Sequence, residues 1–282
     1  MRKIRYVRMN PSGNLTCLVL DPTEETERAG ITAALMCRCE QVGYLMPPRR
    51  AENRARLEMM GGEFCGNASM AAAAWLADQD GRNAGEETEM LLEVSGAEGP
   101  VFCRVRKEGD EWAGAVQMPL PGDFRHMKIL GRDVSAVRLP GMVHLIYCGE
   151  QLEREAAETL LEKGKELFSE PAAGLLQWQE TSGNPVPAAA EKDDCLLPET
   201  YGELTPLVWV RGSGIMVWES ACGSGTAALA CWKSGQEGRS LRLFAAQPGG
   251  TLQSETEWQG DHVSRVMLCG KVQPGAEEIL LI

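Results

Sequence analysis

An eleven-residue segment of this chain occurs twice, and this repeat constrains the fold more than any other feature of the sequence. Residues 65–75 read CGNASMAAAAW and residues 222–232 read CGSGTAALACW, with five identical positions. The second copy begins 157 residues after the first, at position 222 instead of 65. A duplicated unit explains such a repeat. The 282-residue sequence therefore predicts two domains, residues 1–122 with about 270–282, and residues 123–269.

Each copy of the repeat follows a short strand-like run, residues 57–60 or residues 215–218, and opens a segment rich in alanine. Side chains this small are expected inside a protein, so each copy predicts a strand, a turn and a buried helix. Cys65 and Cys222 then lie at helix N-termini, where unpaired backbone amides and the helix dipole stabilise a thiolate. For one copy alone, a small buried core residue would be the better interpretation. Its recurrence favours two reactive thiols.

The residues around these cysteines indicate acid/base chemistry on a small anion. Glycine follows each cysteine and leaves the amides of the first helical turn open to a ligand carboxylate. Two thiols related by a pseudo-twofold axis can remove a Cα proton from one face of an amino acid and return one to the other. Glu219 ends an apolar strand before Cys222 and is the candidate carboxylate beside it. The predicted reaction is inversion at Cα.

Short runs of alternating apolar and polar residues predict strands over much of the chain. The predicted strands are residues 3–9, 14–20, 89–94, 101–107, 111–118, 142–148, 207–211, 215–219, 241–245, 262–269 and 278–282. A helix is predicted from Asp21, as its cap, to about residue 37, and another over about 150–168. Residues 179–202 contain several prolines and predict a loop. The expected fold class is α/β.

Composition and charge exclude several classes of partner. The formal net charge of −12 disfavours nucleic acid and anionic membranes, while a small zwitterionic substrate stays compatible with it. No signal peptide and no apolar run of membrane-spanning length is apparent, so we expect a cytoplasmic protein. The ten cysteines are then expected to be reduced. No set of cysteine and histidine residues has the spacing of a metal site, and none is predicted.

Motifs along nearly the whole chain resemble the diaminopimelate epimerase superfamily, in which paired cysteines act without pyridoxal phosphate. These motifs are Asn10–Asn14, Cys39–Gly43, Gly62–Asn67, Gln117–Pro119, Trp218–Glu219, Cys222–Thr226 and Gln247–Gly250. The match is closest to the histidine racemases of staphylopine-type metallophore pathways. The resemblance implies two α/β domains, each a barrel-like sheet around a central helix, with the active site between them. It also implies an amino-acid substrate and no cofactor, and it leaves a homodimer open.

The resemblance assigns roles residue by residue. Cys65 and Cys222 match the two acid/base thiols, and Glu219 matches an acidic position of the branch. His144 resembles a histidine that assists a thiol, although the asparagine and proline that precede it in epimerases are absent here. The positions that match substrate-binding residues are Asn14, Glu40, Gln41, Gly66, Asn67, Gly223 and Ser224.

Several other functions fit parts of the sequence. Diaminopimelate epimerases carry a longer Glu-Arg-Gly stretch before their second cysteine, and only Ser220-Ala221 separates Glu219 from Cys222 here, which favours histidine over diaminopimelate. Residues 223–228 loosely match a dinucleotide-binding glycine motif, which would indicate an oxidoreductase. A thiol hydrolase using Cys222 with His144, or an amino-acid-binding module without catalysis, would each leave the second cysteine unexplained.

Overall fold

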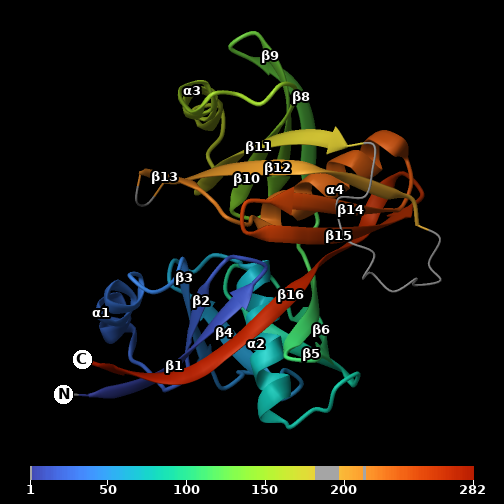
Figure 1. Cartoon of the computed structure of the whole chain (residues 1–282). Coiled ribbons are helices and arrows are strands. Elements are labelled where there is room, and N and C mark those ends of the chain that lie inside the picture. The colour runs from blue at the N-terminus through green and yellow to red at the C-terminus, as the bar shows by residue number, and fades with distance from the viewer. Residues whose placement is uncertain (1, 182–196, 212–213) are drawn as a thin grey trace. The chain divides into compact units, whose positions relative to one another are not determined.

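The protein has a mixed α/β fold that divides into two compact units. The computed structural model describes residues 2–181, 197–211 and 214–282 (Figure 1). Unit 1 comprises Met1–Gln117 and Cys269–Ile282, and unit 2 comprises Met118–Leu268. Among the described helices, none is long and apolar enough to cross a membrane.

Unit 1 is built on a closed β-barrel. Eight described strands neighbour one another in the order β1 (Lys3–Pro11), β2 (Thr16–Val19), β3 (Gln41–Met46), β4 (Ala55–Met59), β5 (Glu87–Val94), β6 (Val101–Glu108), β7 (Glu111–Gln117) and β16 (His262–Leu281). Antiparallel pairing of β1 with β16, with Lys3 opposite Leu281, closes the ring. Closure leaves no unpaired strand edge in the barrel.

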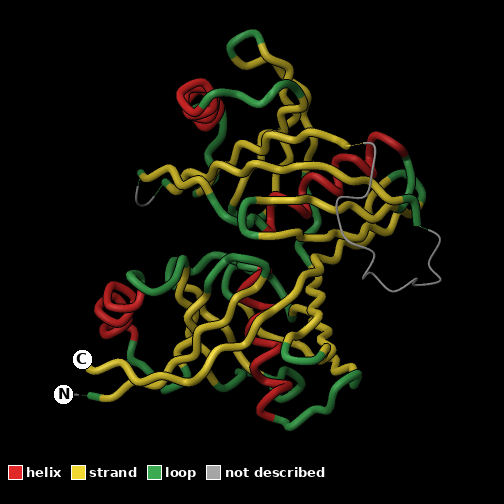
Figure 2. Tube along the Cα trace, viewed as in Figure 1, coloured by secondary structure: helices red, strands yellow, loops and turns green. Residues whose placement is uncertain are grey.

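Helix α2 (Gly66–Gln79) fills the barrel of unit 1. All twelve residues from Gly66 to Ala77 are buried, and most of them are alanine or another small residue. Figure 2 shows the helix running among the strands. Gly114 of β7 faces the helix, since a Cβ there would lie 3.4 Å from the Met70 side chain. Small side chains on both elements thus allow the strands to approach the helix closely.

Helix α1 (Glu25–Leu35) packs on the outer face of the barrel. Its buried residues Ile31 and Leu35 join a cluster with Val42 and Tyr44 of β3. Alternation along each strand separates the side chains that meet α1 from those that meet α2.

Unit 2 is a mixed sheet with a helix on each face. Its strands neighbour one another in the order β15 (Gly250–Gln259), β14 (Leu241–Gln247), β12 (Glu199–Val210), β11 (Ala172–Thr181), β10 (Met142–Cys148), β9 (Arg132–Leu139) and β8 (Asp123–Ile129), and β13 (Ile215–Trp218) pairs with β12. The helices are α3 (Arg154–Lys165) and α4 (Gly223–Glu237).

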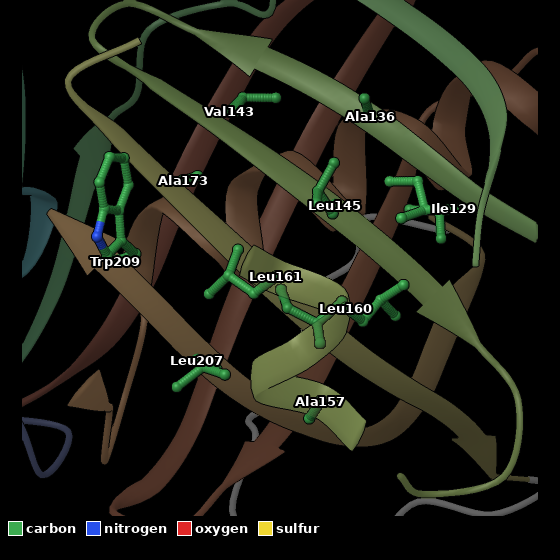
Figure 3. Packing of buried hydrophobic residues seen from close by; sticks show 12 residues of the cluster. Ile129, Ala136, Val143, Leu145, Ala157, Leu160, Leu161, Ala173, Leu207 and Trp209 are labelled. Carbon is green, nitrogen blue, oxygen red and sulfur yellow. The ribbon is translucent and has the colours of Figure 1, made fainter. Parts of the chain in front are cut away.

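Alternation along β10 decides which side chains reach α4. Val143 and Leu145 pack in one cluster with Leu160 and Leu161 of α3 (Figure 3). The other face of β10 contributes Ile146 to the cluster that contains residues 228–230 of α4. His144 has the parity of Ile146, so it points to the α4 side of the sheet.

The start of α1 differs from the prediction. Asp21 was the expected cap, but its carboxylate accepts a hydrogen bond from the Arg5 amide at 2.7 Å. The helix begins three residues later, where Glu24 and Glu27 form a reciprocal capping box. The predicted pattern, a cap residue followed three residues later by a glutamate, is therefore present but lies three residues further along the chain. The helix predicted over 150–168 is present as the shorter α3.

Five strands were not predicted, namely β3, β8, β9, β11 and β15. The first seven residues of β11 are mostly apolar because this part of the strand lies inside the sheet with both faces covered, and such strands lack alternation. The loop prediction for 179–202 is wrong at both ends, because β11 extends to Thr181 and β12 begins at Glu199. Residues 182–196 of that segment lie outside the described residues.

The cluster between α3 and the sheet should carry much of the stability of unit 2. We expect Leu160→Ala to lower the free energy of unfolding by about 2–5 kcal/mol, because it leaves a cavity in a fully buried site. Lys163→Ala, on the exposed side of the same helix, should change it by less than about 0.5 kcal/mol. Urea denaturation followed by circular dichroism measures both. Equal losses would show that α3 is not packed as described.

Candidate active site

Cys65 is the N-cap residue of α2, as predicted from the repeat. Its backbone is extended, with φ −134° and ψ 111°, and its sulfur accepts a hydrogen bond from the Ala68 amide at 3.4 Å. The Ser69 hydroxyl donates to the Cys65 carbonyl at 2.8 Å. The Ala68 amide is one of the N–H groups that a helix start leaves unpaired, and its bond to the sulfur fixes the direction of the thiol.

A chain of hydrogen bonds connects Cys65 with three other residues of unit 1. The thiol donates to Gln41 Oε1 at 3.1 Å, and Gln41 Nε2 donates to Thr16 Oγ1 at 2.7 Å. Thr16 in turn donates to the Asn14 carbonyl at 3.0 Å. Gln41, Thr16 and Asn14 are all buried. The structure thus brings the predicted residues Asn14 and Gln41 to Cys65, and adds Thr16.

The other predicted residues of unit 1 lie on the same elements. Gly66 and Asn67 form the start of α2, and Asn67 is only 2% exposed. Glu40 is exposed, directly before Gln41, and its amide donates to the Leu15 carbonyl at 2.8 Å. The first turn of α2 and the segment around Gln41 therefore present polar groups next to the thiol.

Cys222 is the N-cap residue of α4, in the matching position of unit 2. Its amide donates to Gln247 Oε1 at 2.8 Å, and Gln247 Nε2 donates to Thr226 Oγ1 at 2.9 Å. Thr226 closes the ring by donating to the Cys222 carbonyl at 2.8 Å. Thr226 and Ser69 are equivalent in the repeat, and each hydroxyl bonds the carbonyl of its cysteine.

Gln247 and Thr226 were not predicted as parts of the site. The signal for Gln247 was present in the Gln247–Gly250 motif, and that for Thr226 in its match to Ser69. Neither signal says that the two side chains meet. β14 follows α4 and returns to the helix start, and this places Gln247 beside the Cys222 amide.

Burial dominates the electrostatics of Cys222. The residue is 3% exposed, and burial raises the pKa of its thiol well above the usual range. The Glu219 carboxylate raises this pKa further, whereas the Ser224 hydroxyl and the Gly225 amide lower it. A side chain at Gly225 would crowd the thiol, because a Cβ would lie 2.7 Å from Leu176 Cδ2 and 3.1 Å from the Cys222 sulfur. The thiol form of Cys222 therefore prevails at neutral pH.

His144 reaches Cys222 through Ser224. The ring Nε2 lies 3.0 Å from Ser224 Oγ, and that oxygen lies 3.6 Å from the Cys222 sulfur. His144 is fully buried, and burial lowers its pKa to about 3, so the ring is neutral at physiological pH. The predicted residues His144, Glu219, Cys222 and Ser224 are thus brought together within unit 2, with Gly223 at the start of the same helix.

A cavity of about 1140 Å³ opens elsewhere on unit 1. Its walls include Arg28, Tyr44, Arg56 and Glu58, and none of the predicted site residues. Arg28 and Arg56 both form ion pairs with Glu58 there. Within the described ranges, no group of three or more His, Cys, Asp or Glu side chains could hold a metal ion.

Comparison with known proteins identifies relatives over nearly the full length. The family model described as the histidine racemase CntK N-terminal domain matches residues 3–188 and 195–280. A histidine racemase of Staphylococcus aureus is 28% identical over 258 residues, which cover 88% of this chain and 87% of that protein. A histidine racemase of Fusobacterium nucleatum is 25% identical, with 88% of each chain covered.

Solved structures support the same fold at low sequence identity. A PhzF-family phenazine biosynthesis protein of Bacillus anthracis has a TM-score of 0.69 and 12% identity, with 100% of each chain covered. A hydroxyproline epimerase of Agrobacterium vitis has a TM-score of 0.65 and 13% identity, covering 99% of this chain and 93% of that chain. The protein is an amino-acid racemase of the isomerase class, and it belongs to the histidine racemase CntK N-terminal domain family.

Proposed function

We propose that the protein interconverts L- and D-histidine, with Cys65 and Cys222 as its two acid/base residues. The observation that carries the proposal is that both cysteines are N-cap residues of buried helices, one in each unit. The curated relatives named histidine racemases support the choice of substrate. The repeat, the shared N-cap position and the family therefore lead to one reaction.

Each thiol acts on one face of the substrate Cα. One cysteine, as thiolate, takes the Cα proton, and the resulting carbanion takes a proton from the other cysteine, which is then the thiolate. The two sulfurs exchange roles in the reverse direction. The substrate carboxylate binds the amides at the helix starts, those of Gly66 and Asn67 and those of Gly223 and Ser224, where the helix dipole favours an anion. The reaction needs no cofactor in this proposal.

The raised pKa of Cys222 suits this chemistry. A thiol held protonated by burial and by Glu219 is ready to donate to a carbanion. Once Cys222 has donated its proton, its thiolate is a stronger base than an ordinary thiolate. The difference between its pKa and the much higher pKa of the Cα–H group is therefore smaller. Glu219 therefore assists Cys222 by keeping its thiol protonated. His144, which is connected to Cys222 through Ser224, is assigned to the same thiol.

The carboxylates of Glu40 and Glu219 suit an imidazole side chain, since each can accept its N–H groups or pair with its protonated form. We also assign Asn14 and Gln41, which are connected to Cys65 by hydrogen bonds, to substrate binding. We also propose membership of the diaminopimelate epimerase superfamily, supported by the barrel around a central helix in unit 1 and by the repeat. A reducing, cytoplasmic setting would keep both thiols active, and the resemblance to staphylopine-type racemases supports a role in metallophore biosynthesis.

The substrate is tested with a panel of L-amino acids and chiral chromatography. We expect L-histidine to yield D-histidine until the two enantiomers are equal, because they have the same free energy in solution. Its kcat/KM should exceed that of diaminopimelate by at least about tenfold. Faster turnover of diaminopimelate would contradict the choice of histidine and leave the racemase activity itself standing.

The two thiols are tested with Cys65→Ala and Cys222→Ala. Each change should reduce racemisation at least about 100-fold, because it removes the acid or base of one face. Each variant should still exchange the α-proton of one enantiomer with solvent deuterium, since abstraction on the intact side needs only its own thiolate. Proton NMR measures both rates.

Cys37→Ala is the matched control for these variants, because Cys37 is an exposed thiol on unit 1. Its racemisation rate should stay within about twofold of the wild type, as is usual for surface changes. Undiminished racemisation in either Cys65→Ala or Cys222→Ala would rule that thiol out of the reaction.

A further inference from the structure

We propose that His144 and Ser224 form a directed hydrogen-bond relay that stabilises the Cys222 thiolate, with His144 donating to Ser224 and Ser224 donating to the sulfur. Ser224 is in this view a positioning residue for Cys222, in addition to any contact its amide makes with substrate. The inference deepens the proposed function and rests on it for its role in catalysis. The geometry lies entirely within unit 2 and involves β10 and the first turn of α4.

The direction of the first hydrogen bond follows from the surroundings of the imidazole. Among the described residues, Nδ1 of His144 has no hydrogen-bond partner and is buried. A neutral imidazole carries its proton on one nitrogen only. An N–H group buried without an acceptor is rarer and costlier than a lone pair without a donor. The proton is therefore on Nε2, which donates to Ser224 Oγ at 3.0 Å.

The packing of β11 explains why Nδ1 has no partner. Gly174 pairs with His144 across the parallel strands, and a Cβ on Gly174 would lie 2.5 Å from Nδ1. The ring thus fills the space above a glycine, where the backbone is already bonded in the sheet. Any side chain at this position would displace the imidazole.

The direction of the second hydrogen bond follows from the first. Because Ser224 Oγ accepts from His144, its own hydrogen is left to donate. Two sulfur atoms are within reach, Cys222 Sγ at 3.6 Å and Met142 Sδ at 3.5 Å. A thioether is a weak acceptor, and a hydrogen bond to a charged acceptor is about twice as strong as one to a neutral acceptor. The hydroxyl therefore turns to Cys222 when that thiol ionises.

The relay opposes two influences that favour the thiol form. Burial and the Glu219 carboxylate both disfavour the thiolate, whereas the Ser224 hydroxyl and the Gly225 amide favour it. Gln247, which holds the Cys222 amide, is uncharged, and His144 stays neutral above about pH 3. The relay transfers no proton. It makes ionisation of Cys222 easier and so permits this residue to act as base as well as acid.

The test measures the ionisation of Cys222 without substrate. The whole protein is alkylated with iodoacetamide at fixed pH values from about pH 7 to about pH 10.5, below the midpoint of a thiol as buried as Cys222, where the alkylation rate is proportional to the thiolate fraction. Tandem mass spectrometry locates the label, because Cys222 and buried Cys231 lie on the same tryptic peptide. We expect Ser224→Ala to slow the alkylation of Cys222 by about tenfold at each pH, which corresponds to a midpoint raised by about one pH unit. Ser224→Thr keeps the hydroxyl and should retain the wild-type rate.

Two further variants separate the relay from a general loss of structure. Gly174→Ala displaces the His144 ring without changing Ser224 or Cys222, so alkylation of Cys222 should also slow. Met142→Leu removes the competing sulfur acceptor and should leave the rate unchanged or raise it. Should Gly174→Ala fail to fold, Ser224→Ala and Ser224→Thr still decide the question.

Unchanged or faster alkylation of Cys222 in Ser224→Ala would overturn the relay, since a hydroxyl that donates to His144 would instead turn its lone pairs to the thiolate. Slower alkylation in Ser224→Ala, together with a wild-type protein that does not racemise histidine, would uphold the relay and refute the proposed function. The two failures are therefore distinguishable, because alkylation requires no turnover.

Discussion

Both units depend on the burial of a helix of small side chains against strands. In α2 every residue from Gly66 to Ala77 is buried, and α4 places residues 227–231 in the core of unit 2. Alanine side chains let the strands approach closely, so the buried residues along each helix serve its packing. Its N-cap is the position from which a reactive group can emerge with a fixed direction. This constraint explains why a cysteine starts each helix.

The two thiols are held alike but surrounded differently. A hydroxyl of the first turn bonds the cysteine carbonyl in both cases, from Ser69 and from Thr226. Cys65 is partly exposed and donates to the neutral Gln41, whereas Cys222 is buried beside Glu219 and Ser224. Two sulfurs with different environments suit a reaction in which one must be thiol while the other is thiolate.

The repeat and its local chemistry could be read from the sequence because they depend on neighbouring residues. Cys65 and Cys222 lie at helix starts, and the strand before each helix is present, as the repeat predicts. Contacts that depend on register could not be predicted in this way. The meeting of His144 with Ser224 requires the parity of β10 and a glycine at position 174, and Gln247 reaches Cys222 only through the return of β14. The missed strand β11 lacks alternation because both of its faces are covered.

The central claim is that inversion uses two separate proton carriers, and isotope labelling tests it most directly. L-Histidine is incubated with the enzyme in D₂O, and the deuterium at Cα is measured in both enantiomers during the first turnovers. Because the donating thiol has already exchanged with solvent, the account predicts that new D-histidine carries deuterium while the remaining L-histidine stays largely unlabelled. Deuterium appearing in recovered L-histidine at the same rate as in D-histidine would indicate a single shuttling base and contradict the account.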